Sequence, residues 1–232
     1  MKFGFVQVGE QQRTRWLHDA VRKAAEHHLL ADIHDACRPA GFSRTYPNLL
    51  TQEGIRGNEH MPTAAHNVTL PFTRAIAGAG DYTVCYYTPR IQTTRAHQLA
   101  LPVVMYSPLQ FLFWYDRPSA YQGEPEIEFF ERVPVTWDET RVLDGEIGKL
   151  VVIARRKGRE WFVGALTNEE ARSLSIPLDF LEPGAAFEAR IFPDGDGPKS
   201  VVIETRTVTS GDALEAELAP SGGQAIRFEP VR

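Results

Sequence analysis

The chain has 232 residues and is 43% hydrophobic, which is enough apolar material for one large domain or two modest ones. Its net charge of −5, with lysines and arginines scattered along the sequence, provides no basic surface for a phosphate backbone and argues against nucleic-acid binding. No apolar run approaches the roughly 20 residues that span a bilayer, and the N-terminal residues lack the pattern of a signal peptide, so we expect a soluble chain with no membrane contact.

The first part of the chain alternates strand-like and helix-like segments. Residues 3–8 and 29–33 are short apolar runs typical of buried strands. Between them, residues 13–30 carry apolar side chains at helical spacing, and we place Trp16 and Val21 on the buried face of that helix. These segments form a β-α-β opening.

Breaker residues are frequent in the next segment. Residues 37–51 contain Pro39, Gly41 and Pro47, so we predict an extended loop that shapes a pocket. Farther along, the apolar patterns predict helices at residues 70–78, 93–106 and 124–130, strands at 82–86 and 109–114, and a short fifth strand at 54–57. Most aromatic side chains at 111–115 are expected in the core, with one or two free to stack on a sugar ring.

The pattern of apolar and turn-forming residues changes at about Trp137. Short apolar runs follow, separated by turn sequences such as PDGDGP and PSGG. We predict strands at residues 150–154, 161–166, 173–178, 186–191, 201–207, 213–218 and 225–228. Regular short strands of this kind indicate an antiparallel β-sandwich. The sequence therefore divides into residues 1–136, of the α/β class, and residues 137–232, an all-β domain.

Carboxylates follow the strand-like runs of residues 31–59. Asp35 comes directly after His34 at the end of the second run, and Glu53 and Glu59 bracket the next one. Acids at the ends of barrel strands suggest a site, either as general acid and base or as oxygen ligands of a hard cation such as calcium. Alternatively, Glu53 and Glu59 are solvated loop acids paired with neighbouring arginines, and composition alone favours this second interpretation.

Four longer motifs occur in one order: RTYPNLLTQEGIRGNE at 44–59, HNVTLPFTRAIAGAGDYT at 66–83, TTRAHQLAL at 93–101 and VTWDETRVLDGEIG at 135–148. With these motifs the chain resembles glycoside hydrolase family 97, the family of α-glucosidases and α-galactosidases, from its start to about residue 195. The resemblance implies hydrolysis of the α-glycosidic bond of an α-linked oligosaccharide or glycoside, of the α-glucosidase type with an inverting pattern.

The resemblance also implies roles for individual residues. Glu59 lies where the general acid of inverting members is expected, and Glu53 where a calcium ligand is expected. Asp35 lies at the position of the base and second calcium ligand, which is usually Glu. We add His34 and Arg44 as predicted substrate-binding residues.

Two positions distinguish inverting from retaining members. Retaining members carry Gly where this chain has Asp35. Their aspartate nucleophile would fall at Gly4, which has no carboxylate. Both positions therefore indicate the inverting pattern.

Residues 1–136 hold too few strands for a closed barrel, which needs eight strands and typically about 250 residues. We therefore predict the C-terminal half of a (β/α)₈ (TIM) barrel followed by the β-sandwich domain. Full family members also have an N-terminal sandwich and early barrel strands, which this sequence lacks. Because a half barrel leaves strand edges unpaired, we expect a homodimer or association with a separate N-terminal half.

Calcium binding and turnover both depend on the N-terminal sandwich and the early barrel strands of full family members. Asp35 and Glu53 give calcium only two protein ligands, where it takes about six to eight oxygens, so binding should be weak at best. The alternative to an enzyme is a non-catalytic carbohydrate-binding or assembly module that kept the pocket rim. The two cysteines, Cys37 and Cys85, leave the cellular compartment open.

Overall fold

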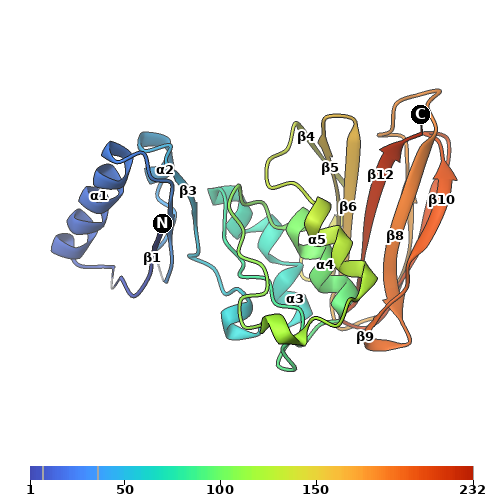
Figure 1. The fold of residues 1–232 in the computed structure, drawn as a ribbon, viewed down its shortest axis with the longest axis horizontal. Helices are drawn as coiled ribbons and strands as arrows, with labels where there is room; N and C mark the ends of the chain where they lie inside the picture. Colours follow the sequence, from blue (N-terminus) through green and yellow to red (C-terminus); the bar gives the residue numbers. More distant parts are fainter. Residues whose placement is uncertain (7, 36, 232) are drawn as a thin grey trace.

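The computed structural model describes residues 1–6, 8–35 and 37–231. The chain begins with a small parallel sheet, continues through a middle region of short helices, and ends in a large antiparallel sheet (Figure 1). The fold is therefore mixed α/β, and most of its paired strands are antiparallel.

The N-terminal sheet contains three parallel strands in the order β1 (Lys2–Phe3), β2 (Ala31–Ile33) and β3 (Leu49–Gln52). Helix α1 (Gln11–Glu26) connects β1 to β2 and confirms the predicted β-α-β opening. The first strand is shorter than predicted, and residue 7 of that prediction lies outside the described residues.

The buried face of α1 differs from the prediction at one position. Leu17 is 2% exposed and packs with Val21 against Ile33 of β2, whereas Trp16 is 54% exposed. Trp16 instead meets Phe3 edge to face at the end of the sheet, with ring centroids 6.4 Å apart. Placing Trp16 on the buried face was therefore wrong, because the neighbouring leucine takes that direction on the helix.

The predicted loop at residues 37–51 contains helix α2 (Phe42–Thr45) and most of strand β3, so it is more ordered than expected. The predicted strand at 54–57 does not form in the described structure. Gly54 has φ +45°, and the Arg74 guanidinium donates to the carbonyl oxygens of Gln52, Glu53 and Gly54. Since Arg74 occupies these carbonyls, the strand ends at Gln52.

The middle region consists of short helices and extended segments. Its helices are η1 (Asn58–His60), α3 (Ala64–Asn67), η2 (Leu70–Phe72), η3 (Arg74–Ala77), α4 (Arg95–Val104), η4 (Pro118–Ala120), η5 (Pro125–Ile127) and α5 (Glu128–Arg132), where η denotes a 3₁₀ helix. The helix predicted at 70–78 is thus two 3₁₀ turns separated at Thr73. Among the described residues, each helix is too short or too polar to cross a lipid bilayer.

The two strands predicted in this region are reduced to isolated parallel contacts. Val84 pairs with Leu112, and Gln52 at the end of β3 pairs with Gly80. Extended segments therefore continue the parallel arrangement after β3 without forming regular strands. The half barrel stays a prediction.

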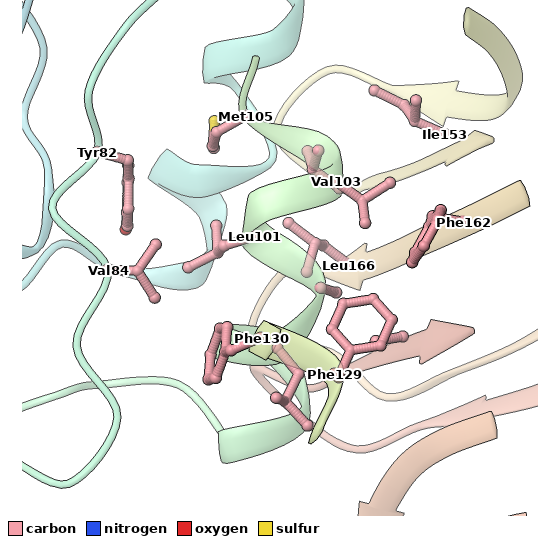
Figure 2. Packing of buried hydrophobic residues seen from close by; sticks show 14 of the residues in the cluster. Tyr82, Val84, Leu101, Val103, Met105, Phe129, Phe130, Ile153, Phe162 and Leu166 are labelled. Atoms are coloured by element: carbon pink, nitrogen blue, oxygen red, sulfur yellow. The ribbon is translucent and has the colours of Figure 1, made fainter. Parts of the chain in front are cut away.

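Helix α4 is the buried connection between the two parts of the chain. The Thr94 hydroxyl caps its start by accepting from the backbone N–H of His97 at 3.1 Å, and residues 96–104 are all buried. A helix that is apolar on all sides is typically buried between layers. Figure 2 shows Leu101 of α4 between Val84 on one side and Leu166 of the large sheet on the other.

The large antiparallel sheet has the order β10 (Glu204–Val208), β8 (Phe187–Gly195), β12 (Gly223–Pro230), β6 (Glu160–Thr167), β5 (Leu150–Lys157) and β4 (Glu139–Glu146), with β9 (Gly197–Val201) paired to β8. A second sheet pairs β7 (Arg172–Pro177) with β11 (Ala213–Leu218). Strands β5 to β8 and β10 to β12 agree with those predicted, whereas β9 begins within PDGDGP, where a turn was predicted. The missed strand β4 is exposed along nearly its whole length, so it carries no apolar alternation.

Alternation along the strands builds two separate cores. Val151 and Ile153 of β5 face α4, whereas Val152 and Ala154 belong to the core shared with β7 and β11. On β6, a Cβ at Gly164 would lie 2.8 Å from the Ala100 carbonyl oxygen, so glycine lets α4 approach the sheet closely. The all-β part thus packs on α4 through one face of its large sheet. The domain boundary at residue 136 stays a prediction.

Candidate functional site

His34 lies at the centre of a cluster of four carboxylates. Its Nε2 is 2.6 Å from Asp81 Oδ2 and 3.2 Å from Asp32 Oδ2. Its Nδ1 is 3.4 Å from Glu53 Oε2 and 3.7 Å from Glu59 Oε1. The ring is only 2% exposed, so nearly all of its surroundings are protein groups.

Parallel strand ends bring the first of these groups together. His34 follows β2 and Glu53 follows β3, and the Glu53 N–H donates to the Ile33 carbonyl at 2.7 Å. Because both strands run in the same direction, the residues after them meet at one edge of the sheet. The Asp35 N–H then donates to Glu53 Oε2 at 2.5 Å, which fixes the direction of that carboxylate.

Glu59 is held by a close approach between two chain segments. It lies in η1, whose first residue, Asn58, donates its N–H to the Tyr82 carbonyl at 2.9 Å. A Cβ at Gly57 would lie 2.4 Å from the same carbonyl oxygen, so only glycine allows this contact. The Asn58 side chain also donates to Gln98 of α4 at 2.6 Å. Glu59 therefore takes its position from Tyr82 and α4 rather than from a strand.

A cavity of about 710 Å³ opens beside this cluster. It is lined by Asp35, Arg38, Glu53, Gly54, Ile55, Arg56, Glu59 and His60. Its volume lies within the range of roughly 300–1,000 Å³ found for small-molecule sites. Asp35 has φ +71°, and its Oδ2 accepts from the Val6 N–H at 2.8 Å. A left-handed backbone at a non-glycine residue is typical of functional sites.

Most of the predicted site residues meet here. Asp35, Glu53 and Glu59 line one cavity, and His34 lies directly behind the two glutamates. Arg44 is exposed on α2 and is absent from the cavity lining, so its predicted substrate contact stays a prediction. Arg38 and Arg56 take the cationic positions on the cavity wall instead.

Two functional candidates were missed by the sequence analysis. Asp32 lies inside the apolar run that forms β2, and a charged residue in a buried strand was an available signal. Asp81 directly precedes the strand predicted at 82–86, and from the sequence alone this position favours a turn or cap residue. It does accept the Thr83 N–H at 3.1 Å, but it also accepts from His34, from which it is separated by 47 residues. Trp114 stacks on the His34 ring with a centroid distance of 5.4 Å. The aromatic side chains at 111–114 are only half-buried and Tyr115 is exposed, so placing most of them in the core was wrong.

The cluster sets the charge of His34. Burial alone would lower its pKa, but the contacts with Asp32 and Asp81 outweigh burial and raise it to about 9. Carboxylates face both ring nitrogens, so each nitrogen must carry a hydrogen to be satisfied. Burial also raises the pKa of Glu53 above its ordinary value, despite its hydrogen bond from the Asp35 backbone. An imidazolium thus lies against the two glutamates at neutral pH.

A second buried polar network connects α4 to the C-terminal sheet. His97 donates from Nδ1 to the Gly222 carbonyl at 3.0 Å, and its Nε2 accepts from the Asn67 amide at 3.0 Å. Tyr82 donates its hydroxyl to the Asn67 oxygen at 2.5 Å. This arrangement requires a neutral His97, and burial lowers its pKa to about 4. The network reaches the segment of Tyr82 that positions Glu59.

Two known protein families match parts of this chain. Residues 136–229 match the family described as "Glycosyl-hydrolase 97 C-terminal, oligomerisation". Residues 1–55 match the family described as "Glycoside hydrolase 97". The first match covers nearly all of the large sheet, and the second covers His34, Asp35 and Glu53, whereas Glu59 and Asp81 lie outside both.

Two curated relatives align with nearly the whole chain. A "Retaining alpha-galactosidase" of Bacteroides thetaiotaomicron is 35% identical over 253 residues, covering 98% of this chain and 38% of the relative. A "Probable retaining alpha-galactosidase" of Streptomyces bingchenggensis is 34% identical and covers 97% and 35%, respectively. The chain thus spans little more than a third of the length of these relatives. Their names conflict with the inverting pattern and with the α-glucosidase type predicted from the sequence.

Solved structures show the same fold. A family 97 enzyme from a Pseudoalteromonas species, in complex with panose, is 38% identical with a TM-score of 0.87, covering 95% of this chain and 37% of that one. A structure of a family 97 enzyme from the same Pseudoalteromonas strain, in complex with acarbose, is 39% identical with a TM-score of 0.87. It covers 95% of this chain and 37% of that one. A β-arabinopyranosidase is 27% identical with a TM-score of 0.84, covering 97% of this chain and 38% of that one.

Proposed function

The chain belongs to glycoside hydrolase family 97, and from this premise we propose that its cavity takes part in the hydrolysis of α-glycosidic bonds. The observation that carries the proposal is the convergence of Asp35, Glu53 and Glu59 on one cavity of about 710 Å³. Glycoside hydrolysis needs an acid to protonate the leaving oxygen and a second carboxylate on the other side of the bond. The cavity provides carboxylates for both tasks.

Glu59 is the proposed general acid, and Asp35 the proposed base that activates water. Glu53 and Glu59 do not suit an inverting pair, because their nearest ligand atoms lie within 4.8 Å of each other. Inverting pairs are separated by about 6.5–9.5 Å to admit a water molecule, and retaining pairs by about 5–5.5 Å. Glu53 is therefore assigned to the proposed calcium site rather than to the base.

The proposed reaction has two further properties: whether the anomeric configuration is inverted or retained, and which sugar is accepted. The roles of Glu59 and Asp35 imply inversion, whereas the curated relatives are called retaining α-galactosidases. Two of the similar structures contain panose and acarbose instead. We therefore propose an α-linked hexoside, with glucose and galactose as the two sugars to compare.

We expect the chain to hydrolyse p-nitrophenyl α-glucoside or α-galactoside and to release the inverted sugar first. Proton nuclear magnetic resonance during the first turnovers identifies the anomer. Release of the retained anomer would contradict Asp35 as the base and leave hydrolysis itself standing. Sugar binding by calorimetry without turnover would instead favour the alternative, a non-catalytic carbohydrate-binding module.

Calcium is proposed as a weakly bound ion of this cavity. Glu53 and Glu59 direct oxygens to within 4.8 Å of each other, and Asp35 lines the same space, so these residues fit a hard cation. A bound calcium ion would supply electrostatic stabilisation of the negative charge that develops on the departing glycosidic oxygen. The protonated His34 ring is unsuited as a ligand, because its nitrogens have no free lone pair.

We expect titration with calcium to give weak binding to the wild-type chain and a further loss in Glu53→Gln. The reason is that the variant removes one of only three carboxylates where calcium takes about six to eight oxygens. Isothermal calorimetry measures both. Tight binding that is unaffected by Glu53→Gln would place the ion elsewhere.

We also propose that residues 1–136 form half of a (β/α)₈ barrel and that the chain associates through the open edge of this half barrel. The β1–β2–β3 sheet and the parallel contacts at Gly80 and Leu112 support one side of a (β/α)₈ barrel. Phe5 is 99% exposed and Met1 57% exposed beside the open edge of β1. Exposed apolar groups at an unpaired edge favour association. The oligomerisation described for the matched C-terminal family supports the same expectation.

We expect light scattering to give a mass of at least twice 26.0 kDa at micromolar concentrations. The reason is that two open β1 edges can pair about a twofold axis and cover both copies of Phe5. Phe5→Asp should shift the equilibrium towards the monomer, whereas Ile76→Asp, at an exposed site away from this edge, serves as the control. A stable monomer at all concentrations would contradict this proposal.

A further inference from the structure

The far side of the His34 ring is enclosed by two aspartates that do not line the cavity. Asp32 and Asp81 are both 0% exposed, and His34 is 2% exposed. Their carboxylates lie 3.2 Å and 2.6 Å from Nε2, whereas Glu53 and Glu59 face Nδ1. The ring therefore separates a sealed pair of carboxylates from a pair at the cavity.

Asp81 fixes the ring to the surrounding segments. Its Oδ1 accepts the N–H of Thr83 at 3.1 Å and the N–H of Phe111 at 3.3 Å, while its Oδ2 faces His34. One carboxylate thus connects the end of β2 to two later segments of the chain. A charge-assisted hydrogen bond of 2.6 Å is among the short, strong ones.

Asp32 is the unusual member of the cluster. Both of its side-chain oxygens are buried without a hydrogen-bond partner among the described residues, and its ionic contact is the one with His34. A buried carboxylate in such a place is strongly unfavourable unless it is paired. An apolar side chain would fill this strand position at lower cost, so the carboxylate must contribute through His34.

Aromatic rings restrict the remaining freedom of the imidazole. Trp114 stacks on it at 5.4 Å with an interplanar angle of 26°, and Phe111 meets its edge at 6.0 Å. Lys2 lies over the same Trp114 ring, with Nζ 3.9 Å from the centroid. The imidazole therefore has one face covered and one nitrogen anchored.

We infer that Asp32 and Asp81 are positioning residues, which hold the His34 ring so that Nδ1 donates towards Glu53 and Glu59. In this arrangement the two aspartates never touch the substrate. They act on the reaction through the direction of one N–H bond, which orients the carboxylates at the cavity floor. The effect on turnover rests on the proposed function, whereas the effect on the ring does not.

The test measures the ring directly and turnover separately. Long-range ¹H–¹⁵N spectra of the isotope-labelled chain report the state and hydrogen bonding of each His34 nitrogen. Asp81→Asn is expected to shift the Nε2 resonance, because an amide that keeps the two backbone N–H bonds on its oxygen presents its NH₂ to the ring. Loss of the outer partner of a metal-ligating histidine lowers activity by about 10- to 100-fold, and by analogy we expect a loss of this order here, in kcat more than in KM.

Asp116→Asn is the matched control. Asp116 accepts the N–H groups of Tyr86, Tyr87 and Thr88 at 2.5, 2.9 and 2.7 Å, and it makes no contact with His34 that the structure shows. If Asp81 only braced the backbone, both variants would lower thermal stability and neither would move the His34 nitrogens. Such a result would overturn the inference.

Asp32→Asn provides a second variant should Asp81→Asn fail to fold. It removes one carboxylate of a buried ion pair while His34 keeps its contact with Asp81, so the melting temperature is expected to fall only modestly. The His34 Nε2 resonance should still shift, and unchanged ring signals would overturn the role of Asp32. If the wild-type chain shows no turnover while the ring signals move as expected, the proposed function fails and the inference about the ring stands.

Discussion

Glu59→Gln is expected to lower the hydrolysis of an alkyl α-glycoside by about 10²- to 10⁴-fold, the usual contribution of a general acid. The leaving alkoxide of such a substrate is a strong base and needs a proton as the bond breaks. Glu59 lines the cavity, and the contacts of the preceding residue, Asn58, with Tyr82 and Gln98 hold it there. Glutamine keeps the size of the side chain and removes the proton donor.

The leaving group makes this test specific for the acid role. A p-nitrophenolate departs without protonation, so Glu59→Gln should retain much more activity on the aryl glycoside than on the alkyl one. Glu131→Gln, on the exposed face of α5, is the matched control and should leave both rates unchanged. An equal loss on both substrates would transfer the acid role to another residue, such as Glu53.

Stability towards acid is expected to depend on His97. Its pKa is lowered from 6.5 to about 4 in the folded chain, chiefly by burial, so the unfolded chain binds the proton more tightly. The stabilisation is complete above about pH 6.5 and is lost as the pH falls towards 4, because only the unfolded state gains a proton in this window. The shift corresponds to about 3 kcal/mol in the free energy of unfolding at most.

Urea denaturation at several pH values measures this contribution. His97→Gln is expected to flatten the fall in unfolding free energy between pH 7 and 4.5, even if lost hydrogen bonds lower its absolute stability. His27→Gln replaces an exposed histidine at the end of α1 and should keep the wild-type slope. Equal slopes for His97→Gln and the wild type would show that His97 does not titrate in this way.

Hydrophobic periodicity was sufficient to predict the helices and strands that pack against one continuous surface. Alternation predicted the central strands β5, β6, β8 and β12, because each has one face in the core with α4 and the other in the core with the smaller sheet. Helices α1 and α4 were predicted from their spacing, with boundaries shifted by a few residues. Strand β4 was missed because it is exposed along nearly its whole length and carries no such pattern.

Local sequence failed where long-range hydrogen bonds decide the backbone. Arg74 takes the carbonyls of Gln52, Glu53 and Gly54, so the chain cannot continue as a strand there. The segments at Val84 and Leu112 meet through a single parallel pair. No propensity of the residues themselves distinguishes such segments from regular strands.

The sequence by itself determined the family motifs and the identity of the carboxylates Asp35, Glu53 and Glu59, because these signals are local. Only the tertiary structure decided that Asp32 and Asp81 enclose His34. The ionic contact between His34 and Asp81 spans 47 residues, and no periodicity encodes a distance of that kind. A buried charge is tolerated only where the fold brings its partner, so the function of such a residue becomes visible when the chain has folded.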